Sequence, residues 1–238
     1  MRAAGRPKTD LANEPRPVTS IIERIQLPYP VPYYGQVASP ELAADFFEHG
    51  RPLESDPRWA EFGASSAPAY AYWADRACGI ACVKMCAEAL GGPVRPMMDW
   101  IQAGLDLDGY AVTTHENGEK EEIGWVHQCL SDLLAPYAAR AWPQAAAVDE
   151  IAAHLAAGRL VIASVSYQIG TTQPVTRRGG HLVVVTGVER DADGVRALVV
   201  SNPSGRTIHL RQNARIPADR FLAGYSGRII VIEPKPSA

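Results

Sequence analysis

The pattern of apolar and polar positions changes character after Arg159. Before it, helix-like segments alternate with Pro- and Ser-containing stretches. After it, apolar residues gather in short β-branched runs separated by Gly, Asn, Asp and Pro, which is typical of antiparallel strands joined by turns. These runs are residues 160–167, 182–188, 197–201, 207–210 and 228–232. Helices first and strands later predict an α+β fold with helices packed on one antiparallel sheet.

The strongest helix prediction covers residues 77–90. This segment is rich in Ala, Met, Lys and Glu, and it ends at Gly91-Gly92-Pro93, a sequence that stops helices. Shorter helices are predicted where apolar side chains lie between start and stop signals. They comprise a short helix from Ser39, with Pro40 at its first position, and the segments 123–134 and 147–156.

The remaining segments predict irregular structure. Residues 1–20 are polar and contain prolines, so we expect a disordered tail ahead of a single domain at 21–238. Three prolines within 27–36 favour an extended path. Residues 50–72 and 105–121 lack a clear period and are interpreted as loops.

Composition narrows the functional classes. With 238 residues, 47% of them hydrophobic, the chain can build one sizeable core. Charged residues make up 21%, the formal net charge is −3 and both signs are scattered, so we expect no nucleic-acid partner. No apolar run is long enough for a membrane span or a secretory signal, which favours a soluble cytoplasmic protein without a membrane partner. The oligomeric state is not indicated.

The four cysteines do not suggest a disulfide framework. Cys78, Cys82 and Cys86 stand at i, i+4, i+8 spacing on one face of the predicted helix, where they cannot readily pair. No second pair of Cys or His stands at ligand spacing, so we predict no metal site and keep a zinc protein only as a minor alternative. Cys82, Cys86 and Cys129 are interpreted as core residues.

Cys78 is the candidate nucleophile. It lies where the strongest predicted helix begins, and a thiolate at a helix N-terminus gains from the helix dipole and from free backbone N–H groups, which lower its pKa. Gly79 would let a substrate approach the backbone closely. A buried structural cysteine is an equally simple interpretation of the Cys-Gly pair alone.

His181 and Asn202 are the candidate partners of Cys78. His181 follows Gly179 and Gly180 and opens a predicted strand, a position at the rim of a sheet. Asn202 ends the next strand, where its amide could accept the imidazole N–H and orient the ring. An Asn-Pro-Ser-Gly sequence is also an ordinary turn.

Four short segments, taken together, resemble the functional segments of the double-glycine leader peptidases, a branch of the papain-like cysteine peptidases. They occur in the order found in that family and the likeness extends from about residue 28 to about residue 232. The segments are the nucleophile segment (78–85, CGIACVKM), the His strand (180–187, GHLVVVTG), the turn that usually carries Asp-Pro (201–205, SNPSG) and the oxyanion-glutamine segment (31–36, VPYYGQ). Because no transmembrane or nucleotide-binding segment follows, the likeness is greater to free-standing members than to transporter-fused ones.

This resemblance implies a papain-like fold in which the helix headed by Cys78 packs on the sheet. Cys78 would be the nucleophile, His181 the general base and then acid, and Asn202 the group that orients His181. Gln36 would donate its side-chain amide to the oxyanion. The family usually has Asp at the position of Asn202, although Asn serves in papain-like enzymes.

The resemblance also implies an insertion at about residues 37–76. Its aromatic residues, including Tyr72 and Trp73, would suit a substrate wall, and simple packing is the alternative. Together with Gly79 and Gly180 they are the candidate substrate-binding residues.

The implied function is cleavage of a peptide or amide bond through an acyl-thioenzyme, which requires no cofactor. Water as the acceptor makes the protein a peptidase or amidase. An amine as the acceptor makes it a biosynthetic acyltransferase or amide ligase. A binding protein that retains the fold without activity is a further alternative.

Overall fold

An antiparallel sheet of seven strands forms the centre of the computed structural model, which describes residues 21–236. The strand order is β4–β9–β5–β6–β7–β8, and β1 also pairs with β6. The strands are β1 (Glu23–Gln26), β4 (Ala138–Ala145), β5 (Leu160–Val165), β6 (His181–Asp191), β7 (Gly194–Ser201), β8 (Ala214–Pro217) and β9 (Arg228–Pro234). The predicted α+β class is therefore confirmed. The predicted tail of residues 1–20 lies outside the described residues.

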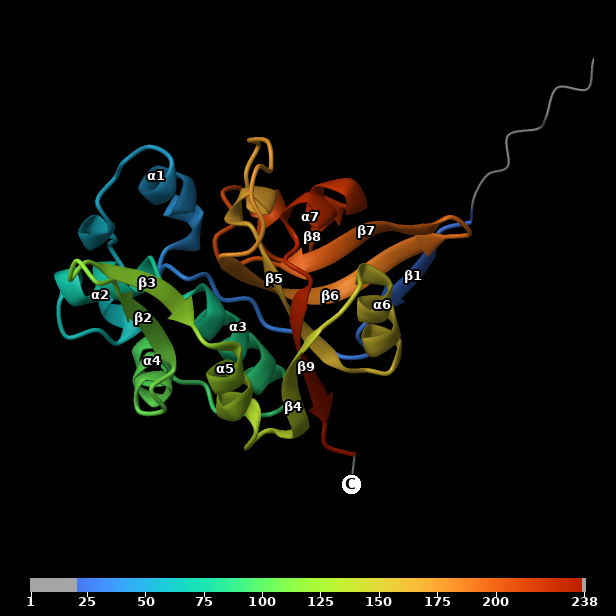
Figure 1. Cartoon of the computed structure of the whole chain (residues 1–238), viewed down its shortest axis with the longest axis horizontal. Helices are drawn as coiled ribbons and strands as arrows, with labels where there is room; N and C mark the ends of the chain where they lie inside the picture. Colours follow the sequence, from blue (N-terminus) through green and yellow to red (C-terminus); the bar gives the residue numbers. More distant parts are fainter. Residues whose placement is uncertain (1–20, 237–238) are drawn as a thin grey trace, which may run out of the picture.

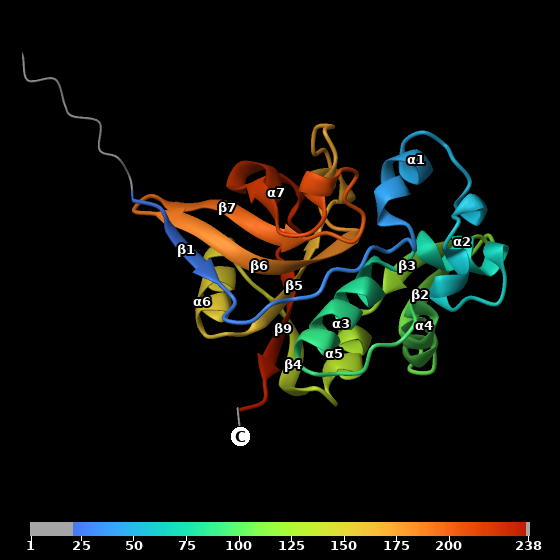
Figure 2. The same cartoon turned by 180° about the vertical axis from the view of Figure 1, so that it is seen from behind.

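Helices cover both faces of this sheet (Figures 1 and 2). The helices are α1 (Ala43–Phe47), α2 (Ala67–Ala74), α3 (Cys78–Ala89), α4 (Met97–Leu105), α5 (His127–Leu134), α6 (Val148–Ala156) and α7 (Ala218–Gly224). A hairpin of β2 (Tyr110–Thr114) and β3 (Lys120–Trp125) lies beside α2 and α4. Within residues 21–236, no helix has the length and hydrophobicity needed to cross a bilayer.

The central strand β5 separates two hydrophobic cores. All six of its residues are buried, because it is covered on both faces. Leu160 and Ile162 pack in the core that contains α3 and α5, whereas Val161, Ala163 and Val165 pack in the core that contains α6 and α7. A continuous apolar run is what a strand buried on both faces requires.

The strand register places two of the predicted catalytic residues at one edge of the sheet. β6 and β7 form an antiparallel hairpin, with Asp191 opposite Gly194 at its turn. The first residue of β6, His181, therefore lies at the same edge as Asn202, which directly follows the last residue of β7.

The segment 37–76 is held together by a buried polar network around Asp56. The Asp56 carboxylate accepts hydrogen bonds from the Ser39 hydroxyl (2.6 Å), the Arg58 N–H (2.9 Å) and the Tyr70 hydroxyl. Ser39, which the sequence suggests as a helix cap, instead makes this tertiary contact. The segment contains three 3₁₀ turns in addition to α1 and α2: η1 (Pro40–Leu42), η2 (Leu53–Ser55) and η3 (Trp59–Phe62).

Several predicted elements differ in the structure. The loop predicted at 50–72 contains most of α2, which Ser66 caps, and the loop predicted at 105–121 contains β2. The helix predicted at 123–134 begins only at His127, because the preceding residues pair as β3. The strand predicted at 207–210 is a 3₁₀ turn, η5 (Ile208–Leu210). The predicted helices at 77–90 and 147–156 correspond to α3 and α6.

Candidate active site

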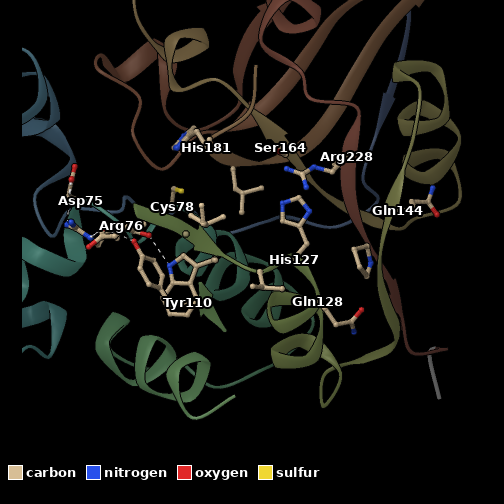
Figure 3. A pocket seen from close by; sticks show the side chains of 18 of the residues that line it. Asp75, Arg76, Cys78, Tyr110, His127, Gln128, Gln144, Ser164, His181 and Arg228 are labelled. Carbon is tan, nitrogen blue, oxygen red and sulfur yellow. Dashed lines mark hydrogen bonds and ion pairs between the residues drawn. The ribbon is translucent and has the colours of Figure 1, made fainter. Parts of the chain in front are cut away.

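Cys78 is the first residue of α3 and lines a groove of about 700 Å³ (Figure 3). Two side chains from distant segments bind the carbonyl groups that precede it. The Gln36 amide donates to Ala74 O at 3.0 Å, and the Trp125 indole donates to Arg76 O at 2.9 Å. These contacts fix the turn that presents the thiol at the helix N-terminus.

The groove has walls from both halves of the molecule. One wall comes from the α3 N-terminus and the β2–β3 hairpin, and the other comes from the sheet and the start of α5. The polar side chains along it are Asp75, Arg76, Tyr110, Glu122, His127, Gln128, Gln144, Ser164, His181 and Arg228.

Burial of Cys78 affects the pKa of its thiol more strongly than the helix N-terminus does. Desolvation raises the pKa of Cys78, while the backbone N–H groups of Leu182 and Gly79 act in the opposite direction and lower it. The sequence-based expectation of a lowered pKa therefore does not describe the isolated thiol. Its activation depends on a base in the groove.

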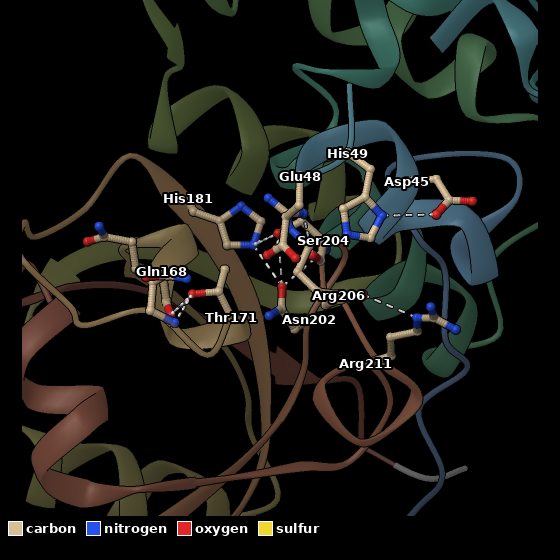
Figure 4. A network of polar contacts seen from close by, with 12 residues as sticks. Asp45, Glu48, His49, Gln168, Thr171, His181, Asn202, Ser204, Arg206 and Arg211 are labelled. Atoms are coloured by element: carbon tan, nitrogen blue, oxygen red, sulfur yellow. Dashed lines mark hydrogen bonds and ion pairs between the residues drawn. The ribbon is translucent and has the colours of Figure 1, made fainter. Parts of the chain in front are cut away.

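His181, the candidate base, lines the same groove. Its Nε2 lies 2.8 Å from Asn202 Oδ1 and 3.1 Å from the Ser204 hydroxyl (Figure 4). Asn202 Oδ1 also accepts the backbone N–H of Ser204 at 3.1 Å, which identifies that atom as the amide oxygen. Because an oxygen faces Nε2, the neutral ring carries its proton on Nε2 and leaves Nδ1 free to accept a proton.

The surroundings of His181 favour its neutral form. The imidazole is 4% exposed, and burial lowers the pKa of His181 to about 4. The hydrogen bond to Asn202 raises the pKa, whereas the charge of Arg206 lowers it. Within residues 21–236, no hydrogen bond joins the Cys78 thiol and the His181 ring. Because burial raises the pKa of Cys78 and lowers the pKa of His181, the neutral thiol and the neutral imidazole are favoured.

Arg206 is a buried cation behind His181. It is 8% exposed, donates to Ser204 O at 2.7 Å and lies 3.5 Å from the Glu48 carboxylate. Its guanidinium also stacks over the Phe47 ring at 4.4 Å. Arg206 therefore connects α1 to the turn that carries Asn202 and Ser204 (Figure 4).

The lowered pKa of His181 predicts a loss of stability in acid. The folded-state pKa of about 4 is below the ordinary value of 6.5, so the unfolded chain binds a proton first as the pH falls. The stability that this pKa difference contributes to the fold is fully present above pH 6.5 and is lost as the pH falls from 6.5 to 4. It amounts to roughly 3 kcal/mol of unfolding free energy, from about 1.4 kcal/mol per pKa unit.

Urea unfolding of wild type and His181→Gln between pH 4 and 7.5 measures this effect. The wild type is expected to lose about 3 kcal/mol more than the variant over that range. Equal pH dependence of the two proteins would show that His181 is not held in its neutral form.

The structure places Gln36 next to the nucleophile turn rather than in the groove wall. The residue is 4% exposed, and its amide nitrogen donates to Ala74 O, with a longer 3.4 Å contact to Asp75 O. Its Oε1 is buried without a partner among the described residues. The amide nitrogen therefore makes one short and one long contact, both to backbone carbonyl groups.

The four candidate substrate-binding residues fall into different environments. Gly180 is exposed, has φ +82° and lines the groove close to His181. Gly79 is buried, and a Cβ there would lie 3.0 Å from Leu182 and from Leu130, so its small size permits helix packing. Tyr72 donates to Glu122, a groove residue. Trp73 packs on the ring of Trp125 beneath the groove.

The other cysteines are buried in the core as predicted. Cys82 and Cys86 are fully buried and Cys129 is 5% exposed. Within the part of the chain that the structure describes, no group of three or more His, Cys, Asp or Glu side chains is placed to hold a metal ion.

Sequence reasoning missed Ser204 and Arg206 as parts of the site. Ser204 was apparent only as a member of an Asn-Pro-Ser-Gly turn. No local pattern marks an arginine as buried, because the partners of Arg206 come from α1, more than 150 positions away in the sequence. The Asn-Pro turn itself was the only available signal.

Comparison with known proteins identifies a family. The sequence model of the Peptidase_C39 like family matches residues 64–226, more than half of the chain. A search of curated protein sequences found no match.

Three solved structures are similar to this chain. A C39-like peptidase from Bacillus anthracis is 16% identical, with a TM-score of 0.47, covering 68% of this chain and 91% of that one. The peptidase domain of Streptococcus ComA, a bi-functional ABC transporter, is 14% identical, with a TM-score of 0.45 and coverage of 68% and 93%. A double glycine motif protease from an AMS/PCAT transporter, in complex with the leader peptide, is 14% identical, with a TM-score of 0.40 and coverage of 66% and 84%.

Proposed function

Because this chain belongs to the Peptidase_C39 like family, we propose that it hydrolyses a peptide or amide bond with Cys78 as the nucleophile. The observation that carries the proposal is the orientation of His181. Its Nε2 is fixed on Asn202 Oδ1, which leaves Nδ1 as the base in the groove that Cys78 also lines. This is the arrangement that a thiol nucleophile requires.

The proposed reaction begins with transfer of the thiol proton from Cys78 to Nδ1 of His181 as sulfur attacks the carbonyl carbon. The tetrahedral intermediate then collapses to an acyl-thioenzyme, and the imidazolium gives its proton to the departing amine. Water deprotonated by His181 attacks the acyl carbon and releases the acid and the free thiol.

Asn202 orients the base without adding a negative charge. Its Nδ2 is buried without a partner among the described residues and lies against Gly170, where a Cβ would come within 2.2 Å of it. An aspartate would place an unpaired carboxylate oxygen in that position, which is costly in a buried site. The uncharged Asn202 amide is therefore compatible with a site in which Cys78 and His181 are both neutral.

The proposed oxyanion donors are the first-turn N–H groups of α3 and the Gln36 amide. To donate to the oxyanion, the Gln36 amide would give up its longer contact, the 3.4 Å one to Asp75 O. A single such donor stabilises the transition state by roughly 3–4 kcal/mol.

The test uses purified protein and a mixture of internally quenched peptides, with mass spectrometry of both peptides and protein. We expect peptide cleavage and, after an acid quench, an acyl adduct on Cys78. Adding a primary amine distinguishes the acceptors, because hydrolysis gives the free acid whereas transfer gives the new amide. Absence of cleavage and of an acyl adduct would favour a binding protein that retains the fold.

A further inference from the structure

The groove beside Cys78 contains a cation without an acidic partner. Arg228, the first residue of β9, lines the groove, and its side chain takes part in no ion pair or hydrogen bond among residues 21–236. Arg76, on the other side of Cys78, is instead paired with Glu122 at 2.6 Å (Figure 3). The groove is therefore polarised, with free positive charge at one end only.

Helix α5 begins at the same end of the groove. Val126, His127 and Gln128 all line it, and no side chain caps this helix. The first-turn N–H groups of a helix have no acceptor within the helix, and they carry the positive end of its dipole. An anion placed here would meet both these N–H groups and Arg228.

A buried hydroxyl provides a third, independent feature. Ser164 is only 3% exposed, yet its hydroxyl has no hydrogen-bond partner within the described residues and lines the groove. This hydroxyl is therefore free to donate to, or accept from, a ligand atom in the groove. In Figure 3, Ser164 lies on the same side of Cys78 as Arg228 and His127.

His127 adds a donor or acceptor but no fixed charge. Burial lowers its pKa, and the charge of Arg228 lowers it further, so the ring is neutral at pH 7. Two other charged side chains that line the groove, Asp75 and Arg76, lie at the opposite end (Figure 3), and Glu122 is there too because it pairs with Arg76. Arg228 is thus the charge that a substrate meets at this end.

We propose that Arg228, Ser164 and the N-terminus of α5 form a subsite that binds a carboxylate of the substrate. This subsite, called the Arg228 subsite, rests on the proposed function and defines its substrate class. The substrate is a peptide with a carboxylate close to the scissile bond, because the guanidinium fork and backbone N–H groups match the geometry of carboxylate oxygens. The carboxylate is either a free C-terminus or an Asp or Glu side chain.

Matched alkylating peptides test the subsite through Cys78. N-iodoacetylglycine and N-iodoacetylglycinamide differ only in a terminal carboxylate against a neutral amide. N-iodoacetyl-aspartic acid α-amide and its asparagine counterpart place the same difference on a side chain. The measured quantity is the ratio of the anionic to the neutral rate constant at Cys78, read by peptide mapping.

For at least one probe pair, we expect the anionic-to-neutral ratio to be at least threefold lower in Arg228→Gln than in wild type. Arg228→Lys keeps the charge and is expected to retain most of the ratio. Arg24→Gln removes an equal charge from an exposed side chain on β1 and is expected to leave the ratio unchanged. Raising the salt concentration should also lower the wild-type ratio. The responding pair identifies the C-terminal or the side-chain carboxylate.

If the anionic-to-neutral ratio falls less than threefold in Arg228→Gln for both probe pairs, the Arg228 subsite is wrong. This holds even where the neutral probes label Cys78 normally. Normal labelling would leave the proposed nucleophile standing. If the neutral probes react no faster with Cys78 than with Cys129, the proposed function fails, and the subsite fails with it.

Discussion

Replacing Cys78 with serine is expected to lower peptide cleavage by about 10⁴-fold or more. A hydroxyl is far harder to deprotonate than a thiol. The base available to it, His181, has a pKa lowered to about 4 and is therefore weak. Serine is nearly isosteric with cysteine, so the fold and the groove should persist. Initial rates with the internally quenched peptides measure the loss.

Cys129→Ser is the matched control. This thiol is buried in α5, 3.6 Å from Gly104 O, to which a serine hydroxyl can also donate. Cleavage by this variant should stay within about twofold of wild type, because Cys129 does not line the groove and serine keeps its size and its hydrogen bond. If Cys78→Ser keeps more than a tenth of the activity, Cys78 is not the nucleophile.

Replacing Lys84 with methionine is expected to destabilise the fold by about 3–5 kcal/mol. Lys84 and Glu88 form an ion pair on α3 at 2.5 Å, with side chains 6% and 7% exposed. Lys84 also donates to Arg95 O at 2.6 Å, and the Tyr34 hydroxyl donates to Glu88 at 2.6 Å. Removing the cation leaves the Glu88 carboxylate buried without its counter-charge. Urea denaturation at pH 7 measures the change.

The double variant Lys84→Met/Glu88→Gln separates charge from packing. It removes both charges and keeps an acceptor for the Tyr34 hydroxyl, so it should be at least about 1 kcal/mol more stable than Lys84→Met alone. If Lys84→Met costs less than about 1 kcal/mol, the pair does not hold α3 as the structure indicates.

The features that the sequence predicted correctly are those with local signals. Helix α3 has good helix formers and a Gly-Gly-Pro stop, and β5, β6 and β9 are β-branched runs. The family resemblance, confirmed by the match over residues 64–226, depended on four short segments in order. His181 and Asn202 were paired because consecutive antiparallel strands bring such positions to one edge of a sheet.

The features that were missed depend on tertiary contacts. The β2–β3 hairpin has exposed, polar strands without an alternating pattern, so residues 105–121 indicated a loop. Lys84 looks like an ordinary surface residue of a helix, and only the fold buries it against Tyr34 and Glu88. The proposed Arg228 subsite likewise combines Ser164 and Arg228, which line one groove but are far apart in the sequence and have no distinctive local pattern.

The central claim is that Cys78 and His181 act as one proton-sharing pair, and the rate of iodoacetamide labelling against pH tests it most directly. The negative charge of a Cys78 thiolate raises the pKa of the His181 imidazolium in the same groove, so a proton that leaves the thiol stays on the ring. While the pair holds that one proton, its thiolate–imidazolium fraction does not change with pH. We therefore predict that labelling of Cys78 in wild type is nearly constant between about pH 5 and 8. In His181→Ala this plateau should disappear, leaving a rate that rises only above about pH 8. A wild-type Cys78 that labels only along that alkaline rise, with no plateau and no dependence on His181, would contradict the account.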